Sequence, residues 1–335
     1  MATIKAWAAK AAGGKLEPFE YDPGPLGAED VEIAIEHCGI CHSDLSMLDN
    51  DWGMTTYPFV PGHEGIGRVV ALGPQAKGLK VGQRVGIGWN ASSCLHCDQC
   101  LAGRQHLCSE VIGTIAGRHG AFADKVRCHW VWAAPIPDAL PYSEAGPLLC
   151  GGTTVYAPLE ILGIRPTSRV GVIGIGGLGH MALKFCRAWG CEVTAFTSSD
   201  SKAEEARAFG AHHVVSSRDS AALKQLAGTF DLIIDTVNVP LDWDGVVGAL
   251  APGGKLHVVG AVLEPIPVVA FSLIMGQRSI SGSPTGSRGT IDAMLGFAAR
   301  HGIAPQTEHF PMNRVNDALD HLRAGKARYR IVLDA

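Results

Sequence analysis

The fold of the second part of this chain can be predicted from one short run, Val170-Gly171-Val172-Ile173-Gly174-Ile175-Gly176-Gly177-Leu178-Gly179-His180. An apolar run at 170–173 is typical of a buried strand, and the glycines after it follow the pattern G-x-G-x-x-G before an apolar helical stretch. Glycines permit a tight turn there, and the free N–H groups at the start of a helix bind phosphate. An ordinary glycine-rich turn is the alternative, but the flanking strand and helix favour a dinucleotide loop made by Gly174, Gly176, Gly177, Leu178 and Gly179.

Apolar strands and helical stretches keep alternating after this loop. Such alternation predicts an α/β domain, with a doubly wound parallel sheet and right-handed crossovers of the Rossmann type. The alternating segments are Arg169–Ile173, Met181–Trp189, Glu192–Phe196, Lys202–Phe209, Phe230–Asp235 and Lys255–Gly260.

The chain before residue 150 has a different texture, with many Gly and Pro residues between short β-type runs such as 31–35 and 67–72. This pattern predicts an irregular, mostly β domain. Near the C-terminus the sequence predicts helices at 291–300 and 314–323 and a closing strand at 329–333 that returns to the first domain. The predicted divisions are therefore 1–150, 151–287 and 288–335.

Composition excludes several classes of protein. The chain has 335 residues and a formal charge of −4, which argues against a nucleic-acid binder. Its 42 glycines follow no G-X-Y period, so collagen is excluded. The sequence shows no signal-type apolar segment and no run long enough to span a membrane, so we expect a cytoplasmic protein. In a reducing compartment, clustered cysteines are more often metal ligands than disulfides.

Four of the ten cysteines lie close together in the sequence. Cys94, Cys97, Cys100 and Cys108 follow the spacing C-x2-C-x2-C-x7-C, which suits a tetrahedral structural zinc site. Two disulfides or unrelated thiols are the alternative. Four thiolates leave no open position on the metal, so catalysis must occur elsewhere.

Three further residues lie beside glycines in separate segments. Cys41, His63 and Cys150 could together supply a Cys2His ligand set, which leaves a fourth position on zinc for water or substrate. By spacing alone this set is weak, since Cys150 could be a core thiol and His63 an ordinary histidine.

The segment that follows the second Rossmann strand bears on cofactor choice. An NAD site carries an acidic residue about twenty positions after the glycine motif, and hydroxyl side chains occupy that place here. Thr197, Ser198, Ser199 and Lys202 suit a 2′-phosphate and favour NADP(H). Asp200 could instead bind the ribose, which would favour NAD(H), and Lys202 could be a solvated residue at the start of a helix.

Taken together, these motifs resemble the zinc-dependent medium-chain alcohol dehydrogenases, and most closely the cinnamyl alcohol dehydrogenase subfamily. The resemblance covers essentially the whole chain. It implies a Rossmann domain and a GroES-like β-rich catalytic domain that holds both zinc sites. The motifs that carry it are Cys38-Gly39-Ile40-Cys41-His42-Ser43-Asp44-Leu45, Gly62-His63-Glu64-x2-Gly67-x5-Gly73, the four-cysteine loop, Leu148-Leu149-Cys150-Gly151-Gly152-Thr153-Thr154-Val155-Tyr156 and Ala327-Arg328-Tyr329-Arg330-Ile331-Val332-Leu333-Asp334.

The resemblance also implies roles for single residues. Cys41, His63 and Cys150 would bind a catalytic zinc, so the chain would hold two zinc ions. Ser43 would hydrogen-bond the substrate oxygen, and His42 would lie near the pyrophosphate. Asp44 and Glu64 would either contact the metal ligands from behind or exchange transiently with a ligand. Alternatives are a helix N-cap for Ser43, a first-turn carboxylate for Asp44 and a merely exposed His42. Further cofactor contacts would be Thr154, Thr236, Gly260, Ser283 and Arg330.

Two departures from the family pattern concern proton transfer and the substrate pocket. Ser46 stands where relatives often carry a relay histidine, and Pro284 stands where plant relatives carry a bulky aromatic residue. Trp52, Met54 and Met275 are candidate lining residues.

The expected reaction is reversible hydride transfer between NADP(H) and a primary alcohol or aldehyde, aromatic or of medium length. A homodimer formed near residues 255–282 is expected from the resemblance. The rivals are an NAD(H)-dependent alcohol or polyol dehydrogenase and a non-catalytic sensor of zinc and dinucleotide.

Overall fold

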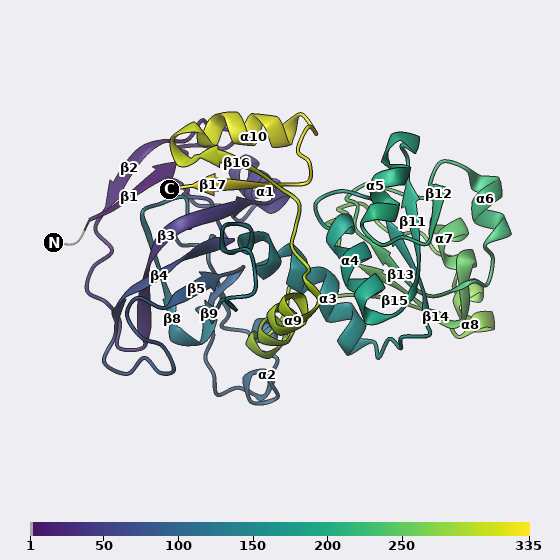
Figure 1. Cartoon of the computed structure of the whole chain (residues 1–335), viewed down its shortest axis with the longest axis horizontal. Coiled ribbons are helices and arrows are strands. Elements are labelled where there is room, and N and C mark those ends of the chain that lie inside the picture. Colours follow the sequence, from purple (N-terminus) through teal and green to yellow (C-terminus); the bar gives the residue numbers. More distant parts are fainter. Residues whose placement is uncertain (1–2) are drawn as a thin grey trace. The chain divides into compact units, whose positions relative to one another are not determined.

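The computed structural model describes residues 3–335, apart from the side chains of Asp200 and Ser220. The chain divides into two compact units, coloured along the sequence in Figure 1. Unit 1 consists of Met1–Cys150 and Thr285–Ala335, and unit 2 is Gly151–Pro284. The sequence predicts breaks after residues 150 and 287, and the returning segment starts at Thr285.

Unit 1 is built on a seven-stranded sheet in the order β16-β17-β3-β4-β5-β9, with β8 also paired to β3. All of its strand pairs are antiparallel except β16 with β17. The mostly β character predicted for this part is confirmed. The strands are β3 (Asp30–Ile40), β4 (Gly65–Leu72), β5 (Arg84–Ile87), β8 (Lys125–His129), β9 (Ala134–Pro135), β16 (Thr307–Pro311) and β17 (Arg330–Asp334), with two small pairs, β1 (Ile4–Ala8) with β2 (Glu17–Tyr21) and β6 (Asn90–Ser92) with β7 (Ile112–Gly113).

The helices of unit 1 cover parts of this sheet. Helix α10 (Val315–Arg323) contacts β16 and β17, and its buried residues Val315, Ala318 and Leu319 follow the helical spacing of an apolar face. Helix α9 (Arg288–His301) contacts β9, and α1 (His42–Asp49) and α2 (Asp98–Leu101) are shorter. Both predicted C-terminal helices and the closing strand are therefore confirmed.

The pairing of β17 with β3 sets up the most important corner of unit 1. Ile331 lies opposite Ile40 in the antiparallel register, so Arg330 comes next to the residue that follows β3, Cys41. Two segments almost 300 residues apart in sequence thus meet at the N-terminus of α1.

Unit 2 is a six-stranded parallel sheet in the order β12-β11-β10-β13-β14-β15. This is the doubly wound Rossmann order, as predicted. Its strands are β10 (Arg169–Ile173), β11 (Glu192–Thr197), β12 (His213–Ser216), β13 (Phe230–Asp235), β14 (Leu250–Val258) and β15 (Ser279–Gly282), and its helices are α3 (Gly151–Ile161), α4 (Gly179–Trp189), α5 (Ala203–Ala208), α6 (Ser220–Gln225), α7 (Trp243–Ala249) and α8 (Ala270–Gly276).

The parallel strands of unit 2 all end at one side of the sheet, here called the carboxyl edge. Their buried apolar residues are typical of strands covered on both faces. The loops that follow β10, β11, β13, β14 and β15 therefore meet along this edge, where open α/β sheets bind their ligands.

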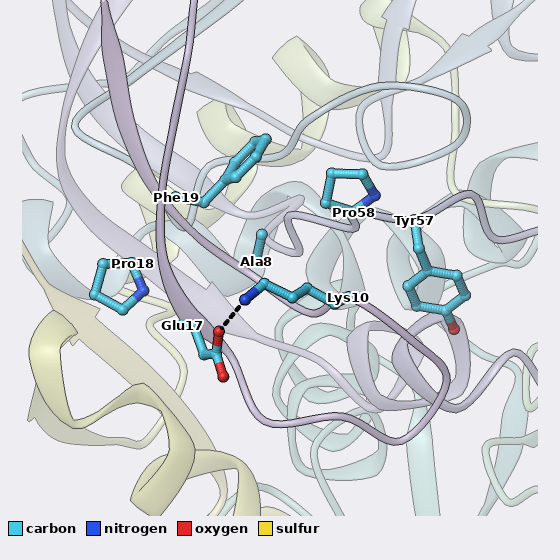
Figure 2. Close-up of a pocket in the computed structure, with 7 residues that line it drawn as sticks. All are labelled: Ala8, Lys10, Glu17, Pro18, Phe19, Tyr57 and Pro58. Atoms are coloured by element: carbon cyan, nitrogen blue, oxygen red, sulfur yellow. Dashed lines mark hydrogen bonds and ion pairs between the residues drawn. The ribbon is translucent and has the colours of Figure 1, made fainter.

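Two cavities lie beside the β1-β2 pair of unit 1. One, of about 210 Å³, is shown in Figure 2, where the side chains of Lys10 and Glu17 form an ion pair at 2.6 Å. The other, of about 300 Å³, is lined in part by Trp7 and Phe19. Both cavities are lined mainly by apolar side chains and a few exposed charged ones. None of the lining residues is among those predicted to bind metal or cofactor, so the candidate functional site lies elsewhere. Among the described residues, no helix is long and apolar enough to cross a membrane.

Candidate metal sites and dinucleotide loop

The four-cysteine loop of unit 1 gathers its sulfur atoms at one point. The Sγ atoms of Cys94, Cys97, Cys100 and Cys108 all lie within 4.8 Å of one another. The Cys94–Cys108 distance is 3.5 Å and the Cys94–Cys100 distance is 3.9 Å. A tetrahedral zinc ion with bonds of about 2.3 Å would separate its sulfur ligands by about 3.8 Å. These four thiols therefore fit a closed zinc site.

The disulfide alternative for this loop is wrong. All ten cysteines of the chain are free. Backbone N–H groups of His96 and Cys97 lower the pKa of the Cys94 thiol to about 6, whereas burial raises that of Cys100 to about 12. One thiol is thus prepared to bind a cation as thiolate, and metal binding must displace the proton of the other.

A second cluster in unit 1 brings together the three scattered candidates. Cys41 is the N-cap of α1, His63 precedes β4, and Cys150 follows a short 3₁₀ turn. The His63 Nε2 atom lies 3.3 Å from Cys150 Sγ, and the two Sγ atoms are 4.0 Å apart. All three side chains are buried, and a carboxylate oxygen of Glu64 lies within 4.8 Å of their ligand atoms.

Asp44 holds this cluster in place. Its Oδ1 atom accepts a hydrogen bond from the Gly62 N–H at 2.9 Å and lies 3.0 Å from His63 Nδ1. Its Oδ2 atom accepts from the Cys41 N–H at 2.9 Å, which completes a capping box on α1. A carboxylate at Nδ1 fixes the tautomer that offers Nε2 to a metal. Burial alone would lower the pKa of His63, but Asp44 and Cys41 raise it well above its usual range, so positive charge is favoured here.

Glu64 and Arg330 form a buried ion pair next to Cys41. The guanidinium hydrogen-bonds Glu64 Oε1 and lies 3.9 Å from Cys41 Sγ. A hydrogen bond from the Cys150 thiol, aided by the charge of Arg330, holds the pKa of Cys41 well below its usual range. Within the described part of the chain, Glu64 Oε2 has no hydrogen-bond partner. A buried carboxylate oxygen and a favoured thiolate together suit a cation.

A glycine makes room for this ion pair. A Cβ atom at Gly39, on β3, would lie 2.0 Å from Glu64 Oε2. Any larger residue there would displace the buried carboxylate.

The first turn of α1 carries the other predicted catalytic residues. Ser43 Oγ accepts a hydrogen bond from the Cys41 thiol at 3.7 Å. Because Cys41 occupies the cap position, the alternative of Ser43 as the N-cap is wrong. His42 is exposed and Ser46 is buried.

Trp89, which was not among the predicted residues, lies beside His63. The Trp89 ring meets the His63 ring edge to face, with centroids 5.0 Å apart, and Trp52 packs against Trp89 at 6.0 Å. Of the other candidate lining residues, Met54 is 49% exposed and Met275, on α8, is 69% exposed. Trp89 directly precedes β6, and no other feature of the sequence indicated its position beside His63.

The glycine loop of unit 2 has the geometry of a phosphate cradle. A Cβ at Gly179 would lie 1.7 Å from the Gly174 carbonyl oxygen, so only glycine lets α4 start there. Gly174 has a φ of +86°, which favours glycine. A Cβ at Gly176, by contrast, would meet nothing within 4 Å. The open space at Gly176 fits a ligand, and α4 points its free N–H groups at the loop.

The end of β11 lies beside this loop. The Ser199 N–H donates to Thr197 Oγ1 at 3.2 Å, and the hydroxyls of Ser199 and Ser201 are 2.7 Å apart. Lys202 Nζ donates to the Ile175 carbonyl at 3.0 Å, so this lysine reaches the glycine loop and is not simply solvated. Ser198 is exposed, and the Asp200 side chain lies outside the described residues.

Comparison with known proteins identifies the family. Residues 27–138 match the family described as alcohol dehydrogenase GroES-like domain, and residues 177–300 match the family described as zinc-binding dehydrogenase. The aldehyde reductase AdhA of Synechocystis sp. is 52% identical over 98% of both chains. The chain belongs to the zinc-dependent medium-chain alcohol dehydrogenases.

Other members of the family are similar over nearly the full length. A probable cinnamyl alcohol dehydrogenase of Arabidopsis thaliana is 39% identical over 98% of this chain and 93% of its own. A solved cinnamyl alcohol dehydrogenase from Sorghum bicolor superposes with a TM-score of 0.95 at 38% identity and covers 99% of this chain and 98% of its own. The Helicobacter pylori enzyme complexed with NADP(H) gives 0.92 at 29% identity, with 99% and 98% covered.

The remaining predicted cofactor residues of this alcohol dehydrogenase divide between the two units. Thr236, at the carboxyl edge, donates to the carbonyls of Ile173 and Gly174 at 2.8 and 3.0 Å and so braces the glycine loop. Gly260 and Ser283 lie at the same edge, while Thr154 is buried in the first turn of α3. Arg330 lies in unit 1 beside Glu64, and its predicted phosphate contact stays a prediction.

Proposed function

We propose that this chain interconverts primary alcohols and aldehydes, aromatic or of medium length, by hydride transfer with NADP(H). The observation that carries this proposal is the buried cluster of Cys41, His63, Cys150 and Glu64. Because Glu64 is paired with Arg330, the other three would bind zinc and leave its fourth position open. The four-cysteine loop has all four and would hold a structural zinc, so the proposal includes two zinc ions per chain. The free thiols of all ten cysteines suit a reducing compartment, so the cytoplasm is the proposed location.

A zinc ion held by Cys41, His63 and Cys150 would act as a Lewis acid, which polarises a carbonyl oxygen and lowers the pKa of a hydroxyl. The chain's own residues supply the rest. Asp44 keeps the His63 ring oriented, and the positive charge of Arg330 stabilises the nearby thiolate of Cys41.

In alcohol oxidation one proton must leave the hydroxyl while the hydride leaves the carbon. Ser43 Oγ, next to Cys41, would accept the proton while releasing its own hydroxyl proton, which the neighbouring exposed His42 would carry to solvent. The Trp89 ring limits the access of water to one side of His63. In aldehyde reduction the proton would take the reverse path.

NADP(H) is the proposed cofactor because the end of β11 presents hydroxyls and a lysine. Thr197, Ser198 and Ser199 would hydrogen-bond a 2′-phosphate, and Lys202, anchored on the glycine loop, would add charge. Use of NAD(H) through Asp200 is the second candidate.

The catalytic efficiencies with NADPH and NADH separate the two candidates. We expect NADPH to be preferred, and we expect Lys202→Ala to weaken the use of NADPH by about 10- to 100-fold, the loss typical of a charge-assisted hydrogen bond. The variant should leave NADH use within about twofold. A preference of the unaltered enzyme for NADH would overturn the NADP(H) proposal.

A panel of cinnamaldehyde, benzaldehyde, hexanal and short aldehydes tests the substrate class. We expect the aromatic and six-carbon aldehydes to be reduced most efficiently. The similarity to an aldehyde reductase and to a probable cinnamyl alcohol dehydrogenase supports the aromatic part of this expectation. A zinc and dinucleotide sensor would bind both partners and reduce none of the panel.

A homodimer through unit 2 is also proposed. Strand β15 is the last strand of its sheet, and α8, which precedes it in the chain, exposes Phe271, Ile274 and Met275 by 67 to 69%. An open sheet edge beside an apolar face favours association with a second copy. Sedimentation should give a dimer for the unaltered chain and a monomer for Phe271→Asp, and a monomeric unaltered chain would overturn the proposal.

A further inference from the structure

A buried histidine in unit 2 links two strands through both of its ring nitrogens. His257, on β14, is 1% exposed. Its Nδ1 atom lies 2.9 Å from Ser281 Oγ, and its Nε2 atom lies 2.9 Å from Ser283 Oγ. Ser281 is the register partner of His257 on β15, and Ser283 follows the end of that strand. The imidazole therefore fixes a hydroxyl at the carboxyl edge of the sheet.

The sheet order shows which half of a dinucleotide would pass this hydroxyl. The phosphate cradle follows β10, and the residues proposed to bind the 2′-phosphate follow β11, on one side of β10. The other half of the cofactor must then extend to the opposite side, past β13 and β14 toward β15. The nicotinamide ring and its carboxamide are at that end of the molecule.

The protonation of His257 determines what Ser283 offers. Burial lowers the pKa of His257 to about 4, so the ring is neutral near pH 7 and has one donor and one acceptor nitrogen. In one tautomer Ser283 donates to Nε2 and keeps its lone pairs for an incoming N–H. In the other it accepts from Nε2 and keeps its own proton for an incoming carbonyl. A primary carboxamide has both groups, so either tautomer is complementary to it.

We propose that His257 is a positioning residue for the nicotinamide end of the cofactor, acting through the Ser283 hydroxyl. The inference rests on the proposed use of a nicotinamide dinucleotide but not on the choice between NADP(H) and NAD(H). A merely structural His257 would tie β14 to β15, and its loss would affect every ligand of unit 2 alike.

Two amide substitutions can separate the two ring nitrogens. In His257→Gln the amide reaches about as far as Nε2, so the contact with Ser283 can be kept. In His257→Asn the amide reaches only the Nδ1 position, so the contact with Ser281 can be kept and that with Ser283 is lost. His257→Phe loses both contacts, and Ser279→Ala, earlier on β15, is the matched control.

Calorimetric binding of NADPH and of 2′-phospho-ADP-ribose, which lacks the nicotinamide, gives the test. We expect Asn and Phe at 257, and Ser283→Ala, to weaken NADPH binding by about three- to tenfold, as for one neutral hydrogen bond. Gln at 257 and Ser279→Ala should stay within twofold, and 2′-phospho-ADP-ribose should bind all variants equally. Adding Ser283→Ala to His257→Phe should cause no further loss.

Three results would overturn the proposal. These are equal effects of Asn and Gln at 257, equal weakening of both ligands, and additive losses in the double variant. If the unaltered enzyme prefers NADH, the same series is run with NADH and ADP-ribose, so the inference survives a failure of the NADP(H) proposal. If neither dinucleotide binds, the proposed function itself fails.

Discussion

The two cysteine clusters of unit 1 are built in opposite ways. Cys94, Cys97, Cys100 and Cys108 come from one loop, whereas His63 is 87 residues from Cys150 and Cys41 is 109 residues from it. The loop cluster consists of thiols alone, two of them partly exposed. The scattered cluster, formed by Cys41, His63 and Cys150, is buried and lies among the charged side chains of Asp44, Glu64 and Arg330. Four thiolates would leave no open position on a metal, so the loop cluster can only brace its loop. The scattered cluster, assembled by the whole fold, can control charge and access at a metal.

Removal of a ligand from the scattered cluster should have the largest effect on activity. We expect Cys41→Ala to lower aldehyde reduction by about 1000-fold, or about 4 kcal/mol of barrier, because Lewis-acid catalysis is lost. The melting temperature should change little, since Cys41 adds one small side chain to the core. Full activity with an intact fold would show that this cluster is not the catalytic metal site.

Removal of a ligand from the loop cluster should lower the stability of the fold rather than the activity. Cys97→Ser should cost about 2–3 kcal/mol of folding free energy, because a structural zinc contributes directly to stability. A shift of about 5 °C or more in the melting temperature is expected. Metal analysis should find one zinc fewer, and the turnover per folded molecule should stay within about threefold. A loss of turnover as large as that of Cys41→Ala would remove the distinction between the clusters.

A weaker contact between Asp44 and His63 should have a smaller effect than the loss of a metal ligand. Asp44→Asn keeps the shape of the side chain but weakens its hold on His63 Nδ1, and we expect zinc affinity of the scattered cluster to fall by about 10- to 100-fold. Competition with a chelator, followed by loss of activity, measures this affinity. Ser46→Ala, on the same helix, is the control and should behave like the unaltered chain. Equal affinities of Asp44→Asn and the control would contradict the role of Asp44.

The difference between local and scattered residues also explains which features could be predicted from the sequence. The cysteine loop and the glycine loop are local, so their spacing carried most of the prediction, and the Rossmann strands followed from periodicity. The scattered ligands could be grouped only through the family resemblance. The contact of Arg330 with Glu64 could not be predicted, because it follows from the pairing of β17 with β3. The contacts of Trp89 and His257 depend on strand register, which the sequence pattern does not reveal.

A change at Trp89, whose ring lies beside His63, should have the smallest effect on activity. Trp89 meets His63 edge to face, so a flat substrate bound beside the cluster can stack near this ring. We expect Trp89→Leu to lower the catalytic efficiency with cinnamaldehyde by about three- to tenfold, the value of one aromatic contact, and to leave hexanal within about twofold. The ratio of the two efficiencies is measured because it cancels general damage to the site. Trp7→Leu, in the β1-β2 pair, is the control and should leave the ratio unchanged. If Trp89→Leu also leaves it unchanged, Trp89 supports the position of His63 without selecting the substrate.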